Sequence, residues 1–85
     1  MNIPLIEIRK KLNSHSWDIL ELLNSKESLT YSEVQKKLGV GQAKISKELA
    51  RLEGALLIES ERNPMDSRVL DLKLTEYGLQ ILKLK

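Results

Sequence analysis

The sequence predicts an α+β fold from three observations along its 85 residues. Helical apolar periodicity fills the first half, where a glycine-containing turn, residues 39–41, separates two short helical patterns. Alternation of apolar and polar residues then predicts two strands, residues 56–62 and 69–73, joined by a polar loop, residues 63–68. Thr75 follows the second strand as a helix cap. Helix, turn, helix, two-stranded ribbon and helix is the order of a winged helix-turn-helix, with a three-helix core, a two-stranded β wing and short terminal helices.

The composition limits which classes of protein the chain can belong to. Residues 1–85 are expected to form one domain near the lower size limit for a stable core. A hydrophobic content of 41% is typical of a packed globular protein. The chain has no cysteine, which excludes disulfides, a thiol nucleophile and cysteine-based metal sites. Since His15 is the only histidine, we expect neither a bound metal nor a cofactor.

Two further features of the sequence concern location and charge. The longest apolar stretches are far shorter than the roughly 20 residues that a membrane-spanning helix needs. Residues 1–11 lack a basic start followed by an apolar run, so they do not resemble a secretory signal. We therefore expect a cytoplasmic protein with no membrane partner. The net charge of +2 is only mildly basic and does not by itself identify a nucleic-acid binder.

Two helices and a short strand are expected before residue 31. An apolar stripe predicts a first helix within residues 3–12, with Pro4 in its first turn. Ser14 or Ser16 can cap a second helix, whose apolar residues spread around most of its circumference. We expect this helix to be the central one, because a helix that is apolar on most sides is usually buried on most sides. Residues 29–30 can form a strand of one or two residues.

The helix-turn-helix follows. Thr30 and Glu33 have capping-box spacing, which predicts a short helix that ends at Gly39. Gly39 and Gly41 permit positive φ where the chain reverses. The next helix is expected at about residues 42–53. Its core face carries Ile45, Leu49 and Leu52.

The outward face of the helix at residues 42–53 is basic, with small residues between the charges. Side chains near the start of such a helix can reach base edges in the major groove of DNA. The residues of suitable type are Gln42, Lys44, Ser46 and Lys47. Arg51, one turn further on, is better placed for a phosphate. The alternative interpretation is an ordinary solvated helix face.

The predicted wing carries two arginines, Arg62 and Arg68, on either side of its tip. An arginine at this place can enter the narrow, electronegative minor groove. Asp66 lies two residues before Arg68, and the two can instead form a surface ion pair. Both interpretations can hold, because such a pair would also orient the arginine.

A longer pattern spans the wing and the start of the last helix. Asp66-Ser67-Arg68, followed by Leu74-Thr75-Glu76 and Gly78, contains Asp-x-Arg and Leu-Thr-x-x-Gly in one register. This pattern resembles the MarR-type family of winged-helix transcriptional regulators, and the resemblance covers about residues 16–82. It implies sequence-specific binding of double-stranded DNA as a homodimer. It also implies that the recognition helix and the wing hold the contacts, namely Gln42, Lys44, Ser46, Lys47 and Arg68.

The chain departs from the family pattern in two places. Family members usually carry longer terminal helices that build the dimer and a ligand pocket, whereas only residues 3–12 and 75–84 are available here. The resemblance therefore supports DNA binding better than the sensing of a small-molecule effector. The family also usually has glycine where this chain has Leu56, and Gly54 lies two residues earlier. In size the chain is similar to small winged-helix proteins of archaea, their plasmids and viruses.

The remaining residues favour a binding protein over an enzyme. With one histidine, no Ser-His-Asp arrangement is credible, and the chain lacks a glycine-rich phosphate loop. We expect no enzymatic activity. Ile6 and Leu79 lie off the apolar stripes of the terminal helices, which suggests a two-fold homodimer. The alternative is that they are scattered surface residues of no special role.

The sequence thus predicts a dimeric, DNA-binding transcriptional regulator. One alternative is a winged-helix adaptor that binds another protein, which an apolar outward face on the helix at residues 42–53 would favour. Another is a plasmid partition or replication-origin protein, which would bind DNA but spread along it cooperatively.

Overall fold

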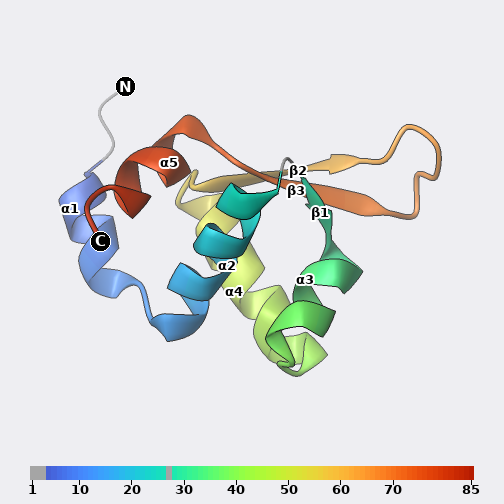
Figure 1. Ribbon diagram of the computed structural model, residues 1–85, viewed down its shortest axis with the longest axis horizontal. Coiled ribbons are helices and arrows are strands. Elements are labelled where there is room, and N and C mark those ends of the chain that lie inside the picture. Colours follow the sequence, from blue (N-terminus) through green and yellow to red (C-terminus); the bar gives the residue numbers. More distant parts are fainter. Residues whose placement is uncertain (1–3, 27) are drawn as a thin grey trace.

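Five helices and three short strands make up the described part of the chain, residues 4–26 and 28–85 of the computed structural model (Figure 1). In chain order they are α1 (Leu5–Lys11), α2 (Ser14–Ser25), β1 (Leu29–Thr30), α3 (Tyr31–Leu38), α4 (Gln42–Gly54), β2 (Ile58–Arg62), β3 (Leu70–Leu74) and α5 (Glu76–Leu82). This order confirms the predicted α+β class and winged-helix arrangement. No helix in these residues combines the length and the apolar character that crossing a membrane requires.

The strands form one antiparallel sheet in the order β1-β3-β2. Leu72 of the central strand pairs with Leu29 of β1 on one side and with Ser60 of β2 on the other. The short strand predicted at residues 29–30 is confirmed, and β3 lies one residue later than predicted. Beyond β2 and β3 the wing loop reaches away from the helices, at the right of Figure 1.

The central helix is α2, as predicted, and it packs against α3, α4, α5 and β3. Its Ile19, Leu20 and Leu23 are buried. They belong to one core cluster with aliphatic side chains from the other elements, including Val34, Ile45, Leu49, Leu52, Leu57, Ile58, Leu72 and Ile81. Burial of one such side chain stabilises a fold by about 1.5–3 kcal/mol. The core thus holds α4 firmly between α2 and β2.

The start of α2 differs from the prediction, because its cap is Asn13 rather than Ser14 or Ser16. The Asn13 side-chain oxygen accepts a hydrogen bond from the Ser16 backbone N–H at 3.0 Å. In return the Ser16 hydroxyl oxygen accepts from the Asn13 N–H at 3.2 Å. Ser16 is therefore the third residue of a reciprocal capping box, a role that serine at this spacing also supports.

The terminal helices α1 and α5 contact each other and lie side by side in Figure 1. Both are shorter than predicted. Pro4 lies just before α1 rather than in its first turn, and α5 ends at Leu82 rather than Leu84. The predicted start at Ile3 lies outside the described residues.

The turn between α3 and α4 follows the prediction at one glycine and not at the other. Thr30 and Glu33 form the expected capping box, with bonds of 3.1 and 3.0 Å. The bond from the Thr30 backbone N–H to the Glu33 carboxylate also holds the pKa of that carboxyl below its ordinary value. Gly39 has φ 63° and ends α3 in the left-handed conformation. Gly41 has φ −59°, so the expectation of positive φ is wrong there, because Gly41 has the extended backbone of a helix cap.

The end of α4 reverses through a leucine. Leu56 has φ 66°, and it is the non-glycine residue with positive φ in the described chain. The N–H groups of Leu56 and Leu57 donate to the carbonyls of Glu53 and Leu52, each at 3.0 Å, which is the Schellman pattern. The reversal delays β2 to Ile58, so the predicted strand start at Leu56 is wrong. A left-handed conformation costs an L-residue about 1–2 kcal/mol, and glycine avoids this cost.

The start of α5 rests directly on this reversal. Thr75 caps α5 as predicted: its hydroxyl accepts from the Gly78 N–H at 3.1 Å and donates to the Leu56 carbonyl at 2.6 Å. A Cβ on Gly78 would lie 2.3 Å from the Leu57 carbonyl oxygen, closer than real Cβ contacts. The Leu-Thr-x-x-Gly pattern therefore has a structural reason. The threonine binds the Leu56 carbonyl just after α4, and the glycine leaves room for the Leu57 carbonyl.

Candidate nucleic-acid interface

The first half of α4 presents an exposed basic surface. Ile45 turns inward and is 0% exposed. The exposed residues around it are Gln42, Ala43, Lys44, Ser46 and Lys47. Among the described residues the cations in ion pairs are Lys10, Arg51, Arg68, Lys73 and Lys85. Lys44 and Lys47 therefore keep their charges available for a partner.

The start of α4 also offers backbone donors. Gly41 precedes the helix and supplies no side-chain cap. The first N–H groups of a helix have no partner within the helix, and the helix dipole places partial positive charge there. This helix start therefore suits an electronegative partner such as a phosphate or the acceptor edge of a base.

Tyr31, the first residue of α3, binds the start of α4 from the side. Its hydroxyl donates to the Gln42 carbonyl at 3.1 Å. The same hydroxyl is hydrogen-bonded to the Ser46 hydroxyl, one turn further along α4. The tyrosine ring is partly buried and packs against the core. Tyr31 thus connects α3 to two successive turns of the exposed surface.

Arg51 differs from the lysines because its guanidinium is bound to other groups of the protein, although the side chain is 49% exposed. It donates to Glu48 at 3.0 Å and to the Lys11 carbonyl at 3.4 Å. Glu48 is 6% exposed and also accepts from the Asn13 amide at 3.0 Å and the Ser16 hydroxyl at 2.9 Å. This Glu48 cluster joins α4 to the end of α1 and the start of α2.

The Glu48 cluster is arranged for a charged carboxylate. Burial raises the pKa of Glu48, whereas the hydrogen bonds from Asn13 and Ser16 lower it. The Arg51 charge lowers it further, and the pKa of Glu48 lies below its ordinary value. Ionised Glu48 therefore stabilises the position of α4.

The wing is ordered by hydrogen bonds of its own. Arg62 donates to the Ser67 carbonyl at 2.7 Å across the loop, and Asn63 donates to Asp71 at 3.1 Å. Arg68 pairs with Asp66 at 3.1 Å and holds the pKa of the Asp66 carboxyl below its ordinary value. The Arg68 side chain is nonetheless 89% exposed. The predicted pair therefore exists and leaves the arginine accessible.

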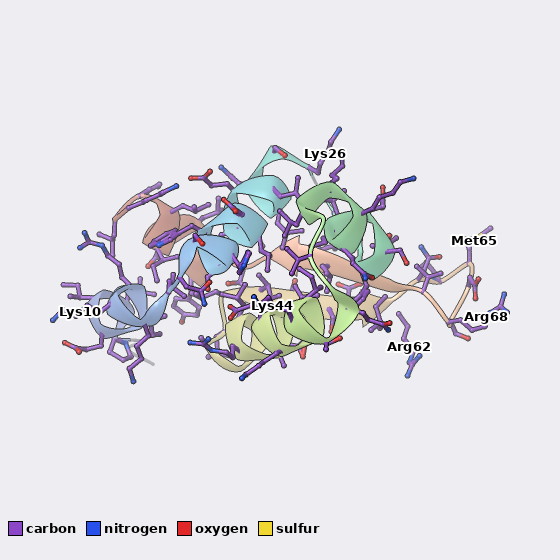
Figure 2. All side chains as sticks on the ribbon, turned by 90° about the horizontal axis from the view of Figure 1, so that it is seen from below. Lys10, Lys26, Lys44, Arg62, Met65 and Arg68 are labelled. Carbon is purple, nitrogen blue, oxygen red and sulfur yellow. The ribbon has the colours of Figure 1, made fainter. Side chains whose placement is uncertain are left out.

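Figure 2 shows how these groups lie relative to each other. Lys44 lies over α4 near the middle of the view, and Arg62, Met65 and Arg68 extend from the wing at the right. Lys10 lies at the opposite end of the molecule, on α1. The helix α4 and the wing are thus seen together on this side.

Three residues of this region were not predicted from the sequence. Tyr31 and Glu48 were not singled out, because their partners lie 11 or more residues away along the chain, except for the Glu48–Arg51 pair. That pair has helical spacing and was the one signal that could have indicated the anchoring of Arg51. Met65, at the wing tip, is 93% exposed.

Within residues 4–26 and 28–85, no group of three His, Cys, Asp or Glu side chains is arranged to hold a metal ion.

Comparison with known proteins identifies relatives of this arrangement. The model of the MarR family matches residues 12–70. The HTH-type transcriptional regulator YdgJ of Bacillus subtilis (strain 168) is 30% identical over 61 residues, which cover 72% of this chain and 37% of the relative. This chain therefore spans little more than a third of that relative's length.

Solved structures share the fold. A mutant of MarR from E. coli, complexed with operator DNA, has a TM-score of 0.81 at 26% identity, covering 94% of this chain and 59% of that chain. ZitR of Lactococcus lactis, a zinc-responsive MarR family member, has a TM-score of 0.77 at 32% identity, covering 85% of this chain and 49% of that chain. The matched residues 12–70 include the helices α3 and α4 and the Asp66-Ser67-Arg68 segment of the wing, whereas the Leu-Thr-x-x-Gly pattern, residues 74–78, lies beyond them. This chain belongs to the MarR family.

Proposed function

We propose that this chain is a cytoplasmic protein that binds double-stranded DNA sequence-specifically as a homodimer and thereby regulates transcription. The observation that supports the proposal most is the exposed basic start of α4. The wing arginines Arg62 and Arg68 are visible from the same side of the molecule (Figure 2). A major groove admits one α-helix, and α4 presents Lys44 and Lys47 on its exposed surface while Ile45, which lies between them in the chain, is buried. The related MarR structure complexed with operator DNA supports the same reading.

The contacts in this proposal divide into two kinds. Gln42, Lys44, Ser46 and Lys47 meet base edges, whereas phosphates are held by the wing arginines and by the helix starts. Arg51 contributes to DNA binding mainly by holding α4 through Glu48, at 3.0 Å, while the exposed part of its guanidinium meets a phosphate. The proposal includes no enzymatic activity, no cofactor and no small-molecule effector.

The homodimer rests on apolar side chains at one end of the molecule. Ile6 of α1, Leu79 of α5 and Leu84 are 60%, 44% and 37% exposed. Because α1 and α5 lie side by side, these residues suit a two-fold interface built from the terminal helices. Sedimentation equilibrium measures the mass directly. A monomer at concentrations that saturate DNA would contradict this part of the proposal.

DNA binding is tested by fluorescence anisotropy with random-sequence duplex DNA over a series of salt concentrations. Binding should weaken steeply with salt, with a slope of about one unit of log K per phosphate neutralised. Lys44→Ala should weaken binding. Lys10→Ala, which removes the same charge at the opposite end of the molecule in Figure 2, should not.

Two other outcomes would lead to different functions. No binding at low salt would contradict the proposal and favour the protein-binding adaptor. Binding that grows cooperatively with DNA length would instead favour a partition or replication-origin protein.

A further inference from the structure

The hydrogen-bonded chain Ser46–Tyr31–Gln42 has a fixed direction. The Gln42 partner is a backbone carbonyl, which can only accept, so the Tyr31 hydroxyl must donate its single proton there, at 3.1 Å. Tyr31 also shares a hydrogen bond with the Ser46 hydroxyl. With its proton already used, Tyr31 can only accept in that second bond. Ser46 must therefore donate its own proton to Tyr31.

This direction changes what Ser46 can offer to a partner. Its side chain is exposed on the surface of α4 between Lys44 and Lys47. A serine hydroxyl has one proton and two acceptor lone pairs. Since the proton points at Tyr31, only the lone pairs face outward. Ser46 thus presents an acceptor and no donor.

We propose that Tyr31 is a positioning residue for base readout, which makes Ser46 select a base with an exocyclic amino group in the major groove. This inference rests on the proposed DNA-binding function. Cytosine offers its N4 amino group and adenine its N6 amino group, whereas guanine and thymine present acceptors at the corresponding positions. A phosphate offers acceptors only, so Ser46 does not bind the backbone. The ambiguity that serine normally has between bases is thereby removed.

The experiment compares the wild type with Tyr31→Phe and Ser46→Ala. Tyr31→Phe keeps the ring that packs on the core and returns the proton to Ser46. Ser46→Ala alters an exposed residue, so it provides a folded second variant. Preferred duplexes are selected from a random pool with each protein. The base read by Ser46 is the position at which Ser46→Ala loses its preference.

At that position the wild type should select cytosine or adenine. Deletion of the exocyclic amino group from this base should weaken the wild type roughly two- to tenfold, the range for one net hydrogen bond, and leave Ser46→Ala unchanged. Tyr31→Phe should accept guanine or thymine there, while its salt dependence stays that of the wild type. A tyrosine with a merely structural role would weaken binding to all sequences alike.

Three results would overturn the inference. The first is a wild-type preference for guanine or thymine at the position that Ser46→Ala identifies. The second is an unchanged base preference in Tyr31→Phe or Ser46→Ala, with DNA binding retained, which would leave the proposed function intact. The third is no DNA binding by the wild type at low salt, which would remove the proposed function and this inference together.

Discussion

The two halves of α4 belong to one helix but differ in how many of their side chains are buried and in what their basic side chains contact. In the outer half, residues 42–47, only Ile45 is buried. In the inner half, residues 48–54, Glu48, Leu49 and Leu52 are buried. The outer half presents charge to solvent, and the inner half is bound to α1, α2 and the sheet. One helix therefore combines an exposed basic surface with a part that is held by its neighbours.

Lys47 and Arg51 show what this difference teaches. Both are basic, and they lie four residues apart on neighbouring turns. Lys47 is exposed, whereas Arg51 is paired with the buried carboxylate of Glu48 at 3.0 Å. The charge and spacing of a residue do not decide whether it binds a ligand or holds the fold. What decides the role of a basic residue is whether the fold places a partner such as Glu48 beside it.

The largest effect on stability is expected where α5 packs against the chain reversal that follows α4. Gly78→Ala would place a Cβ 2.3 Å from the Leu57 carbonyl oxygen and 2.7 Å from the Leu74 side chain. Because both neighbours are packed, we expect a loss of about 3 kcal/mol in the free energy of unfolding, measured by urea denaturation. Gly54→Ala is the control: its Cβ would meet nothing within 4 Å. Equal stabilities of the two variants would contradict the close approach at Gly78.

The second largest effect on stability is expected from a change in the Glu48 cluster. Glu48→Gln keeps the size of the side chain but places an amide donor among the donors of Asn13, Ser16 and Arg51. We expect a loss of about 2 kcal/mol in the free energy of unfolding at neutral pH. Glu59→Gln, on an exposed strand residue, should change it by less than about 0.5 kcal/mol.

The stability difference between the wild type and Glu48→Gln should also depend on pH. The pKa of Glu48 is lowered in the folded protein, so its contribution is complete above the ordinary glutamate pKa and is lost as the pH falls through the lowered value. The difference in stability between wild type and Glu48→Gln should therefore shrink on acidification. A difference that stays constant to the lowest pH at which both fold would show that the charge of Glu48 contributes nothing.

A third change should stabilise the chain reversal that follows α4. Leu56 has φ 66° and is 42% exposed, so it bears the cost of the left-handed conformation. Leu56→Gly should raise the free energy of unfolding by about 1 kcal/mol, because glycine adopts this conformation without strain. Leu56→Ala keeps the Cβ and should bring no such gain. Thermal and urea unfolding of the two variants give the comparison, and an alanine variant as stable as the glycine variant would argue against strain.

The smallest effect on stability is expected in the outer half. Lys47→Ala should change the free energy of unfolding by less than about 0.5 kcal/mol, as is usual for exposed positions. Its slope of log K against log salt for DNA should fall in magnitude by about 1 if Lys47 meets a phosphate, and stay unchanged if it meets a base. Arg51→Ala should lower stability, because it leaves buried Glu48 without its counter-charge. Equal stability losses in both variants would contradict the division of α4.

Local patterns predicted much of this fold. The Thr30–Glu33 capping box, the left-handed Gly39 and the Thr75 cap all depend on residues three or four apart or on a single residue's backbone. The core face of α4 followed from helical periodicity. The start of β2 did not, because an apolar alternating run gives no sign that Leu56 takes positive φ.

The sequence by itself determined the order of the elements, their apolar faces and the likeness to MarR-type regulators. These features depend on the spacing of residues that are close together in the sequence, so they can be recognised without the structure. Only the tertiary structure decided that Arg51 anchors α4, that the Tyr31 hydroxyl is hydrogen-bonded to both Gln42 and Ser46, and that Gly78 must be small. Each depends on groups brought together from distant parts of the chain, such as Arg51 with Lys11 and Tyr31 with Ser46. The direction of a hydrogen bond or the room for a Cβ exists only once those groups are packed against each other.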